Sequence, residues 1–331
     1  MDSKTVSILV VGLGSIGQRH ARLLQSRSDV RLFLCDVDAH HRSETQAAFT
    51  SPVPEFEDFN HALRVRPDIV ILCTPNHLHA PMGLAAIAAG CDVLVEKPIA
   101  DNAVDGVRLV EAAEREGRAL HVGYMLRFDP GLILLHQLLN EGEIGKICGA
   151  RAMVGTYVTL LNSRCNDKEM HPYSLVLDYT HEIDYIRWLL GEPQRVQAMG
   201  TTVGSVEKRP QPNLFQMTLA LESGALVQIH LDYVQYPQRR TLEVYGDRGT
   251  LTYDFMTGEL YHLLRGKEQH SLRRELGPIA QRVDDLFRAE HSSVIQSRLK
   301  QSPPIVTGND GLLTLRVAEL AIDSAKHIDA R

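Results

Sequence analysis

The first 36 residues constrain the fold of this chain most strongly. An apolar run from Val6 to Val11 leads directly into the segment Gly12-Leu13-Gly14-Ser15-Ile16-Gly17. A helical pattern follows, and a second apolar run then ends at Asp36. A buried strand, a glycine turn, a helix and a second strand in this order form a βαβ unit. The sequence therefore predicts an α/β domain that starts at the first strand.

The spacing of the three glycines predicts a dinucleotide site. Gly12 permits a tight turn, Gly14 lets the backbone approach a pyrophosphate, and Gly17 lets the helix pack against the strand. Ser15 and Ile16 lie in the same segment, and we include them among the cofactor-binding residues.

Asp36 lies 19 residues after Gly17, which is the spacing expected of an acid at the end of the second strand. Its carboxylate can accept hydrogen bonds from the adenosine ribose hydroxyls and would repel a 2'-phosphate. We therefore expect NAD as the cofactor. NADP stays an alternative, because His40, His41 and Arg42 follow closely and can contact a phosphate.

Composition excludes several classes of protein. A formal net charge of -6, spread along 331 residues, does not resemble a nucleic-acid-binding surface. The first strand begins within a few residues, and no stretch approaches the length of a membrane span, so we expect no membrane association. The cysteine number is odd and no C-x-x-C spacing occurs, which indicates reduced thiols and a cytoplasmic protein. The five cysteines are Cys35, Cys73, Cys91, Cys148 and Cys165.

Strand and helix patterns alternate up to residue 124 and then change. The alternation predicts a doubly wound parallel sheet, or Rossmann domain, over residues 1–124. Residues 125–331 read as an α+β substrate and oligomerisation domain with a large, mostly antiparallel open sheet of about six strands. A helical pattern over 311–328 can pack back on the first domain. Val227, Ile229, Leu231 and Tyr233 alternate on one strand face, and we expect a homodimer or homotetramer joined through this domain.

Two polar segments follow predicted parallel strands. Thr74-Pro75-Asn76 and then His79 follow one strand, and Glu96-Lys97-Pro98 follows the next. The carboxyl ends of parallel strands are where cofactor and substrate meet in such sheets. Lys97 is therefore a candidate to bind a substrate hydroxyl or the nicotinamide amide, although a solvated loop lysine is the alternative.

A third segment, Leu177 to Gly191, has a helical pattern. On one ideal helix, Asp178, His181, Tyr185 and Trp188 share a face, separate from the apolar residues. An imidazole beside a carboxylate can act as a general base, whereas a surface Asp/His pair is the equal alternative. We expect no metal here, because the sequence supplies no third ligand at a suitable spacing.

Together these segments resemble the glucose-fructose oxidoreductase, inositol dehydrogenase and rhizopine-catabolism (Gfo/Idh/MocA) family over nearly the whole chain. The resemblance implies that Lys97 and His181 are the catalytic lysine and histidine and that Asp178 is a substrate-binding acid. We count Asp178 as a third catalytic residue, which either binds a neighbouring substrate hydroxyl or orients the imidazole. It also implies that Asn76 and His79 line the cofactor crevice, next to Thr74, Pro75 and Glu96. It further rests on the segments Gly123-Tyr124-Met125-Leu126-Arg127-Phe128-Asp129-Pro130 and Tyr245-Gly246-Asp247-Arg248-Gly249-Thr250. The candidate substrate residues are Lys97, Tyr124, Arg127, Tyr157, Asp178 and His181.

The segment Glu169 to Leu175 departs from the family pattern, because many relatives have a glycine run there. Bulkier residues can reshape the pocket, so the resemblance does not fix the substrate. The predicted function is an NAD(P)-dependent oxidoreductase acting on a secondary alcohol of a sugar, inositol or related polyol, with nucleotide-linked and amino sugars included. Two alternatives are an NAD-dependent redox-assisted glycosidase and a non-catalytic cofactor-binding regulatory protein.

Overall fold

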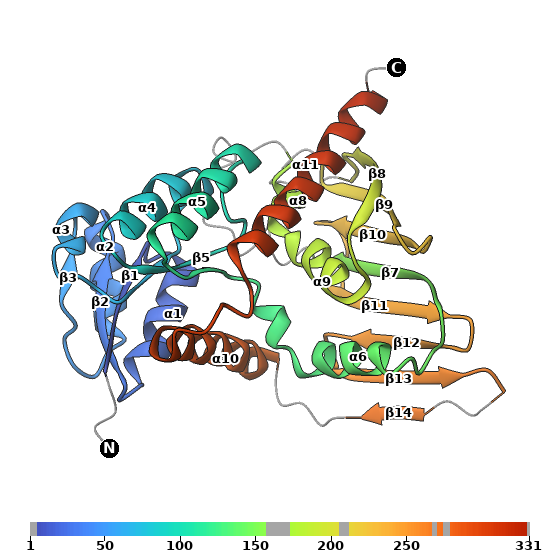
Figure 1. Cartoon of the computed structure of the whole chain (residues 1–331), viewed down its shortest axis with the longest axis horizontal. Helices are drawn as coiled ribbons and strands as arrows, with labels where there is room; N and C mark the ends of the chain where they lie inside the picture. Colours follow the sequence, from blue (N-terminus) through green and yellow to red (C-terminus); the bar gives the residue numbers. More distant parts are fainter. Residues whose placement is uncertain (1–4, 157–172, 205–211, 267–269, 274–278, 330–331) are drawn as a thin grey trace. The chain divides into compact units, whose positions relative to one another are not determined.

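The computed structural model describes residues 5–156, 173–204, 212–266, 270–273 and 279–329. The chain divides into two compact units, which are coloured along the sequence in Figure 1. The first unit contains residues 1–125 and 283–315, and the second contains 126–282 and 316–331. The division expected from the sequence was 1–124 and 125–331, so the difference lies in 283–315, which folds with the first unit.

The first unit is built on a six-stranded parallel sheet, as far as its described residues show. The strands lie in the order β3-β2-β1-β4-β5-β6, and the direction of winding reverses between β1 and β4. The strands are β1 (Val6–Val11), β2 (Val30–Cys35), β3 (Glu55–Phe56), β4 (Ile69–Leu72), β5 (Asp92–Val95) and β6 (Leu120–Val122). The helices are α1 (Ser15–Gln25), α2 (Ala39–Ala47), α3 (Phe59–Leu63), α4 (Asn76–Ala88), α5 (Ala103–Glu116) and α10 (Ile279–Lys300).

Helices cover both faces of this sheet. Figure 1 shows α4 and α5 on one face and α1 and α10 on the other. Val294 and Ile295 of α10 join the same buried cluster as Ile8 and Val10 of β1. Helix α5 begins after Asn102, whose side chain accepts from a backbone amide in the first turn. The predicted doubly wound sheet is confirmed.

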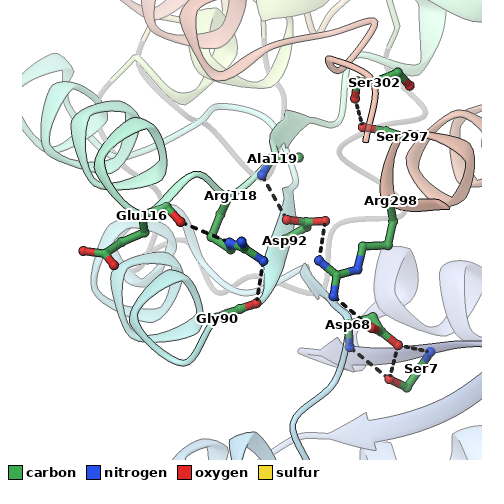
Figure 2. A network of polar contacts seen from close by, with 10 residues as sticks. All are labelled: Ser7, Asp68, Gly90, Asp92, Glu116, Arg118, Ala119, Ser297, Arg298 and Ser302. Atoms are coloured by element: carbon green, nitrogen blue, oxygen red, sulfur yellow. Dashed lines mark hydrogen bonds and ion pairs between the residues drawn. The ribbon is translucent and has the colours of Figure 1, made fainter. Parts of the chain in front are cut away.

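An ion-pair network fixes α10 to the amino ends of two strands. Figure 2 shows the Arg298 guanidinium donating to Asp68 (3.0 Å) and to Asp92 (3.3 Å). Asp68 also accepts from the backbone amide and hydroxyl of Ser7, and Asp92 accepts from the Ala119 amide. This network lies at the strand ends opposite the predicted site. It explains why a segment so late in the sequence belongs to the first unit.

The second unit has a mostly antiparallel sheet of eight described strands in the order β14-β13-β12-β11-β7-β10-β9-β8, with β7 and β10 parallel. The strands are β7 (Ile147–Gly155), β8 (Pro193–Thr201), β9 (Leu214–Leu221), β10 (Leu226–Asp232), β11 (Arg239–Gly246), β12 (Gly249–Asp254), β13 (Glu259–Leu264) and β14 (His270–Arg273). The helical segments are η1 (Met125–Phe128), α6 (Pro130–Asn140), α8 (Ser174–Asp178) and α9 (Thr180–Leu190). Helix α11 (Gly308–Asp329) belongs to the second unit from Arg316 onward. The predicted sheet class is confirmed, with two more strands than the expected six.

The face of β10 that carries Val227, Ile229 and Leu231 is buried within the chain, together with Tyr233 just beyond the strand. These residues form part of the unit's own core and do not offer a surface to a partner. The opposite face of the sheet is open, since Leu226 of β10 and Met199 of β8 are 54% and 58% exposed.

Two further features of the described residues concern membrane spans and cysteines. Among the residues described, no helix combines the length and apolar character that crossing a membrane requires. Cys35, Cys73, Cys91 and Cys148 are free thiols, and burial raises the pKa of Cys91 to about 11. Cys165 lies outside the described residues.

Candidate functional site

The glycine-rich segment has the geometry of a diphosphate-binding loop. Gly12 follows β1 with φ +85°, and a Cβ there would lie 2.7 Å from the carbonyl oxygen of Cys73. A Cβ on Gly17 would lie 1.8 Å from the Gly12 carbonyl oxygen, so only glycine lets α1 approach the turn so closely. A Cβ on Gly14, in contrast, would meet nothing within 4 Å. The loop is therefore tight on the protein side and open on the outer side.

The start of α1 is suited to an anion. Gly14 is the N-cap residue, and no side chain caps the free backbone N–H groups of the first turn. No acidic residue lies in that turn either. Free amides and the positive end of the helix dipole favour a bound phosphate group. The residues present thus fit a dinucleotide diphosphate.

Asp36 is fixed at the carboxyl end of β2. Its Oδ2 accepts from the backbone amide of Leu13 (2.6 Å), and its Oδ1 accepts from the amide of Asp38 (2.8 Å). The carboxylate therefore connects the glycine loop to the turn after β2, where an adenosine ribose lies in this type of fold. The imidazole Nδ1 of His41 is 3.3 Å from Oδ2, and Arg42 donates to the Asp36 carbonyl oxygen. The Arg42 guanidinium and the His41 imidazole thus lie beside the acid.

The segment after β4 is held to the segment after β5 by His79. Thr74 and Pro75 precede α4, which begins at Asn76. The His79 ring is buried, with Nδ1 2.8 Å from the Pro98 carbonyl oxygen and Nε2 2.8 Å from the Thr74 carbonyl oxygen. Burial lowers the pKa of His79 more than these carbonyls raise it, so the neutral ring donates to one of them. His79 thus positions two strand-end loops.

Lys97 follows β5 directly and is half-buried. The Lys97-Pro98 peptide bond is cis, and the backbone amide of Lys97 donates to Glu96 Oε2 over 3.2 Å. In the first unit, the structure brings the glycine loop, Asp36, Thr74 and Lys97 to the carboxyl edge of one sheet. The reversal of winding between β1 and β4 lies at this edge, where α/β sheets bind their ligands.

The prediction of one helix carrying both Asp178 and His181 is wrong. Helix α8 ends at Asp178, Tyr179 has φ -106° and ψ 33°, and α9 begins at Thr180. Tertiary contacts favour the break, because the Tyr233 hydroxyl donates to Asp178 and the Tyr179 ring lies 5.6 Å from the Tyr233 ring. Asp178 is thus positioned by the end of the sheet and not by the helix of His181.

The predicted division of this segment into a site face and a core face is also wrong. His181 is buried in the first turn of α9, and Tyr185 is fully buried against Phe255. Glu182 is buried and accepts two hydrogen bonds from Arg240, at 2.7 and 3.0 Å. The charged residues of α9 are therefore largely buried in the core of the second unit.

Three further substrate candidates have different outcomes. Arg127 is buried and donates twice to Asp184, while its guanidinium lies over the Trp188 ring. Tyr124 is fully buried. Tyr157 lies outside the described residues, as do residues 169–172 of the segment that departs from the family pattern.

Several residues that support the site were not indicated by the sequence. Tyr233, just after β10, and Arg240 of β11 each lie more than 50 residues beyond the acid that they contact. Glu290 and His291 of α10 lie in the first unit beside His20 and Glu96. Within the described part of the chain, His20, Glu96 and Glu290 are also the one group whose ligand atoms are close enough to hold a metal ion. None of these pairings has a signal in local sequence spacing.

Two family models match the chain. The model described as "Oxidoreductase family, NAD-binding Rossmann fold" matches residues 6–124. The model described as "GFO/IDH/MocA C-terminal domain" matches residues 133–252. The two matches follow the order and approximate extent of the two sheets.

Individual relatives are similar to the chain over different lengths. The inositol 2-dehydrogenase of Paracoccus denitrificans is 35% identical over 195 residues, which cover 57% of this chain and 55% of that protein. The chain thus spans little more than half the length of the first relatives that it matches. The inositol 2-dehydrogenase 2 of Saccharopolyspora erythraea is 28% identical over 329 residues, covering 97% of this chain and 93% of that protein. The solved scyllo-inositol dehydrogenase from Lactobacillus casei, with bound NAD(H) and scyllo-inositol, has a TM-score of 0.83 at 22% identity and covers 98% of each chain.

Proposed function

The chain belongs to the GFO/IDH/MocA family of oxidoreductases, and we propose that it transfers a hydride between NAD and a secondary alcohol or ketone carbon of a sugar, an inositol or a related polyol. The observation that carries the proposal is the glycine loop, which is closed on the protein side and open beside the free start of α1. The inositol dehydrogenases among the relatives support the substrate class.

The proposed mechanism assigns separate tasks to three residues. NAD, when bound, accepts or supplies the hydride at its nicotinamide ring. His181 takes the proton of the reacting hydroxyl, and Lys97 donates a hydrogen bond to the same oxygen and stabilises negative charge there. Asp178, held by the Tyr233 hydroxyl, binds a neighbouring hydroxyl of the substrate. Glycine-loop amides and Asp36 bind the diphosphate and the adenosine ribose.

The substrate class extends to nucleotide-linked and amino sugars. Residues 169–175 have bulkier side chains where many relatives have a glycine run, which favours a pocket of a different shape from theirs. NADP is the alternative cofactor, because His41 and Arg42 lie beside Asp36.

The test is an absorbance screen for NADH over cyclitols, aldoses, sugar acids and nucleotide-linked sugars, with NAD and NADP in parallel. NADH formation that depends on both Lys97 and His181 is the expected result. Release of free sugar without net NADH would instead identify a redox-assisted glycosidase. Tight NAD binding with no turnover on any class would favour a regulatory protein.

We also propose a cytoplasmic homodimer or homotetramer joined through the open face of the eight-stranded sheet. Exposed Leu226 and Met199 on that face support the interface, and free thiols support the compartment. Light scattering at micromolar concentration tests the assembly, since a mass equal to one chain of 36.9 kDa would contradict it.

A further inference from the structure

A cluster of ionisable side chains, three of them buried and one half-buried, lies in the first unit and includes the residue before Lys97. It consists of His20 on α1, Glu96 after β5, and Glu290 and His291 on α10. His20 is fully buried, and Glu290 and His291 are each 2% exposed. We call these four residues the Glu96 cluster. Burying so many ionisable groups costs free energy of folding unless each group is paired or neutral.

The carboxylate of Glu96 is held from three sides. His20 Nε2 lies 3.0 Å from Glu96 Oε1, and the Lys97 amide donates to Oε2. Gly123 closes the third side, because a Cβ there would lie 2.9 Å from Cδ of Glu96. The position of the carboxylate is thereby fixed relative to the backbone that carries Lys97.

The same contacts keep Glu96 ionised. Burial by itself would raise the pKa of this carboxyl group, but the His20 hydrogen bond and charge and the nearby Lys97 ammonium together lower it. Glu96 therefore presents a fixed negative charge next to Lys97. His20 in turn contacts Nε2 of His291 through its Nδ1, over 2.7 Å.

Glu290 is the neutral member of the cluster. Both carboxyl oxygens are buried and have no hydrogen-bond partner among the described residues. One of them lies within 4.8 Å of a ring nitrogen of His20 and an oxygen of Glu96. Burial and then the charge of Glu96 raise the pKa of Glu290 well above its usual value. Double ionisation of two carboxyl groups this close in a buried site is unfavourable, and the proton belongs on Glu290, because Glu96 receives the hydrogen bonds that stabilise a carboxylate.

A proton on Glu290 explains the arrangement of the Glu96 cluster better than a bound metal ion does. His20, Glu96 and Glu290 would provide one imidazole and two carboxylates, which is an acceptable ligand set for a divalent cation. However, the hydrogen bond of 3.0 Å from His20 to the Glu96 carboxylate requires a proton on the ring nitrogen, which a metal ligand would have to lose. The Lys97 ammonium beside Glu96 would also repel a second cation.

We propose that Glu96 is a positioning residue for Lys97, locked in place by His20 and packed against Glu290 in its neutral acid form. The inference rests on the proposed function only in giving Lys97 a catalytic task. Because His20 lies on the helix that begins at the glycine loop, the pair also connects the diphosphate-binding helix to the loop of Lys97. The cluster thus sets the position of the ammonium without touching substrate.

The isosteric variants Glu96→Gln and Glu290→Gln test this assignment. Glu96→Gln removes the fixed charge and should lower kcat roughly 10- to 100-fold, with the dissociation constant of NADH changed less than about threefold. Glu290→Gln replaces a neutral acid with a neutral amide of the same shape and should keep kcat within about threefold. Equal losses in the two variants, or a larger loss in Glu290→Gln, would overturn the proposal.

A second measurement needs no substrate and separates this inference from the proposed function. Reductive ¹³C-methylation labels lysines for NMR, and the Lys97 signal is identified by its absence in Lys97→Arg. Glu96→Gln should shift that signal, whereas Glu290→Gln should leave it in place. A shifted signal in a protein that oxidises no polyol would reject the proposed function and keep the positioning role. An unshifted signal in Glu96→Gln would reject the positioning role.

The neutral state of Glu290 is checked directly. The infrared spectrum of the wild-type protein should contain a protonated-carboxyl band that is absent from Glu290→Gln. Metal analysis of the purified protein provides the counter-test. One equivalent of a divalent metal that is lost in Glu290→Gln would show that a cation, and not a proton, occupies the cluster.

Discussion

The guanidinium of Arg127 donates two hydrogen bonds of 2.8 Å to the carboxylate of Asp184, and both side chains are buried in the second unit. Replacing one member of such a pair strongly lowers the free energy of unfolding, because the other charge stays buried without its partner. We therefore interpret Arg127 as part of the framework that supports α9, and this interpretation leads to the first prediction.

Asp184→Asn should lower the free energy of unfolding by about 3 to 5 kcal/mol, measured by urea denaturation. The matched control is Asp285→Asn, which removes the partner of Arg288 from an exposed pair and should change stability by less than about 1 kcal/mol. If Arg127 instead contacts substrate, Arg127→Lys would raise KM while leaving the unfolding transition in place.

Two glycine-to-alanine variants of the glycine loop should differ in their effects on stability and on NADH binding. Gly17→Ala places a Cβ 1.8 Å from the Gly12 carbonyl oxygen, so it should lower the unfolding temperature in the absence of cofactor. Gly14→Ala meets nothing within 4 Å and should leave that temperature unchanged, while weakening NADH binding because the methyl group enters the diphosphate space. Fluorescence titration with NADH measures the second effect. Unchanged NADH affinity in Gly14→Ala would mean that the diphosphate does not bind here.

Asp36 should determine the choice between NAD and NADP. A carboxylate about 4 Å from a phosphate costs on the order of 1 to 4 kcal/mol in partly wet surroundings. Asp36→Ser should therefore weaken NAD binding and improve NADP binding. Asp38→Ser is the control, because the Asp38 side chain caps α2 by accepting from the His40 amide and serine can also cap. Tighter binding of NADP than NAD by the wild-type protein would refute this role for Asp36.

His181 and Lys97 should differ in the kinetic effect of their loss. His181→Asn should lower kcat roughly 100- to 10,000-fold with NAD affinity nearly intact, which is typical of a removed general base. Lys97→Ala should lower kcat and also weaken NAD if the ammonium contacts the nicotinamide. The acid limb of the kcat/KM profile should vanish in His181→Asn. Near-normal turnover of that variant would make Lys97 the stronger candidate for the base.

Acid should destabilise the first unit partly through His121 on β6. Burial lowers the pKa of His121 to about 4, whereas an imidazole in an unfolded chain has a pKa of about 6.5. Between these values the unfolded state binds more protons, so stability is complete above pH 6.5 and falls as the pH drops toward 4. The loss from this residue should reach about 2 kcal/mol at pH 5.

His121→Gln cannot titrate and should show a smaller drop in unfolding free energy between pH 7.5 and pH 5 than the wild-type protein. His291, whose pKa burial also lowers, contributes in the same direction in both proteins and cancels in the comparison. Parallel pH dependences of the two proteins would contradict the prediction.

The sequence predicted those features that depend on local pattern. The roles of Gly12, Gly14 and Gly17 follow from steric rules of the turn, and the structure gives each the predicted surroundings. Alternation of apolar residues also indicated about six strands of the second sheet, but it did not indicate β13 and β14. Strand β14, like β3 of the first sheet, is too short for a periodic signal.

Features that depend on tertiary contacts could not be predicted in this way. An ideal helix through Asp178 and His181 satisfies the local pattern, but the contacts of Tyr179 and Asp178 with Tyr233 interrupt it. The Glu96 cluster combines residues of α1 and α10 with the residue that follows β5, and no spacing rule joins positions so far apart. The buried side of β10 was likewise ambiguous, because alternation shows that two faces differ without showing which one the chain itself covers.

The late position of α10 in the sequence has a consequence for synthesis of the protein on the ribosome. Val294 and Ile295 fill the core beside β1, and Arg298 joins Asp68 to Asp92, yet all three are translated after the whole second sheet. A nascent chain that has emerged only to residue 125 would expose the apolar surface that α10 later covers. The nucleotide-binding half is therefore the first to begin folding and cannot finish until the segment up to residue 315 leaves the exit tunnel.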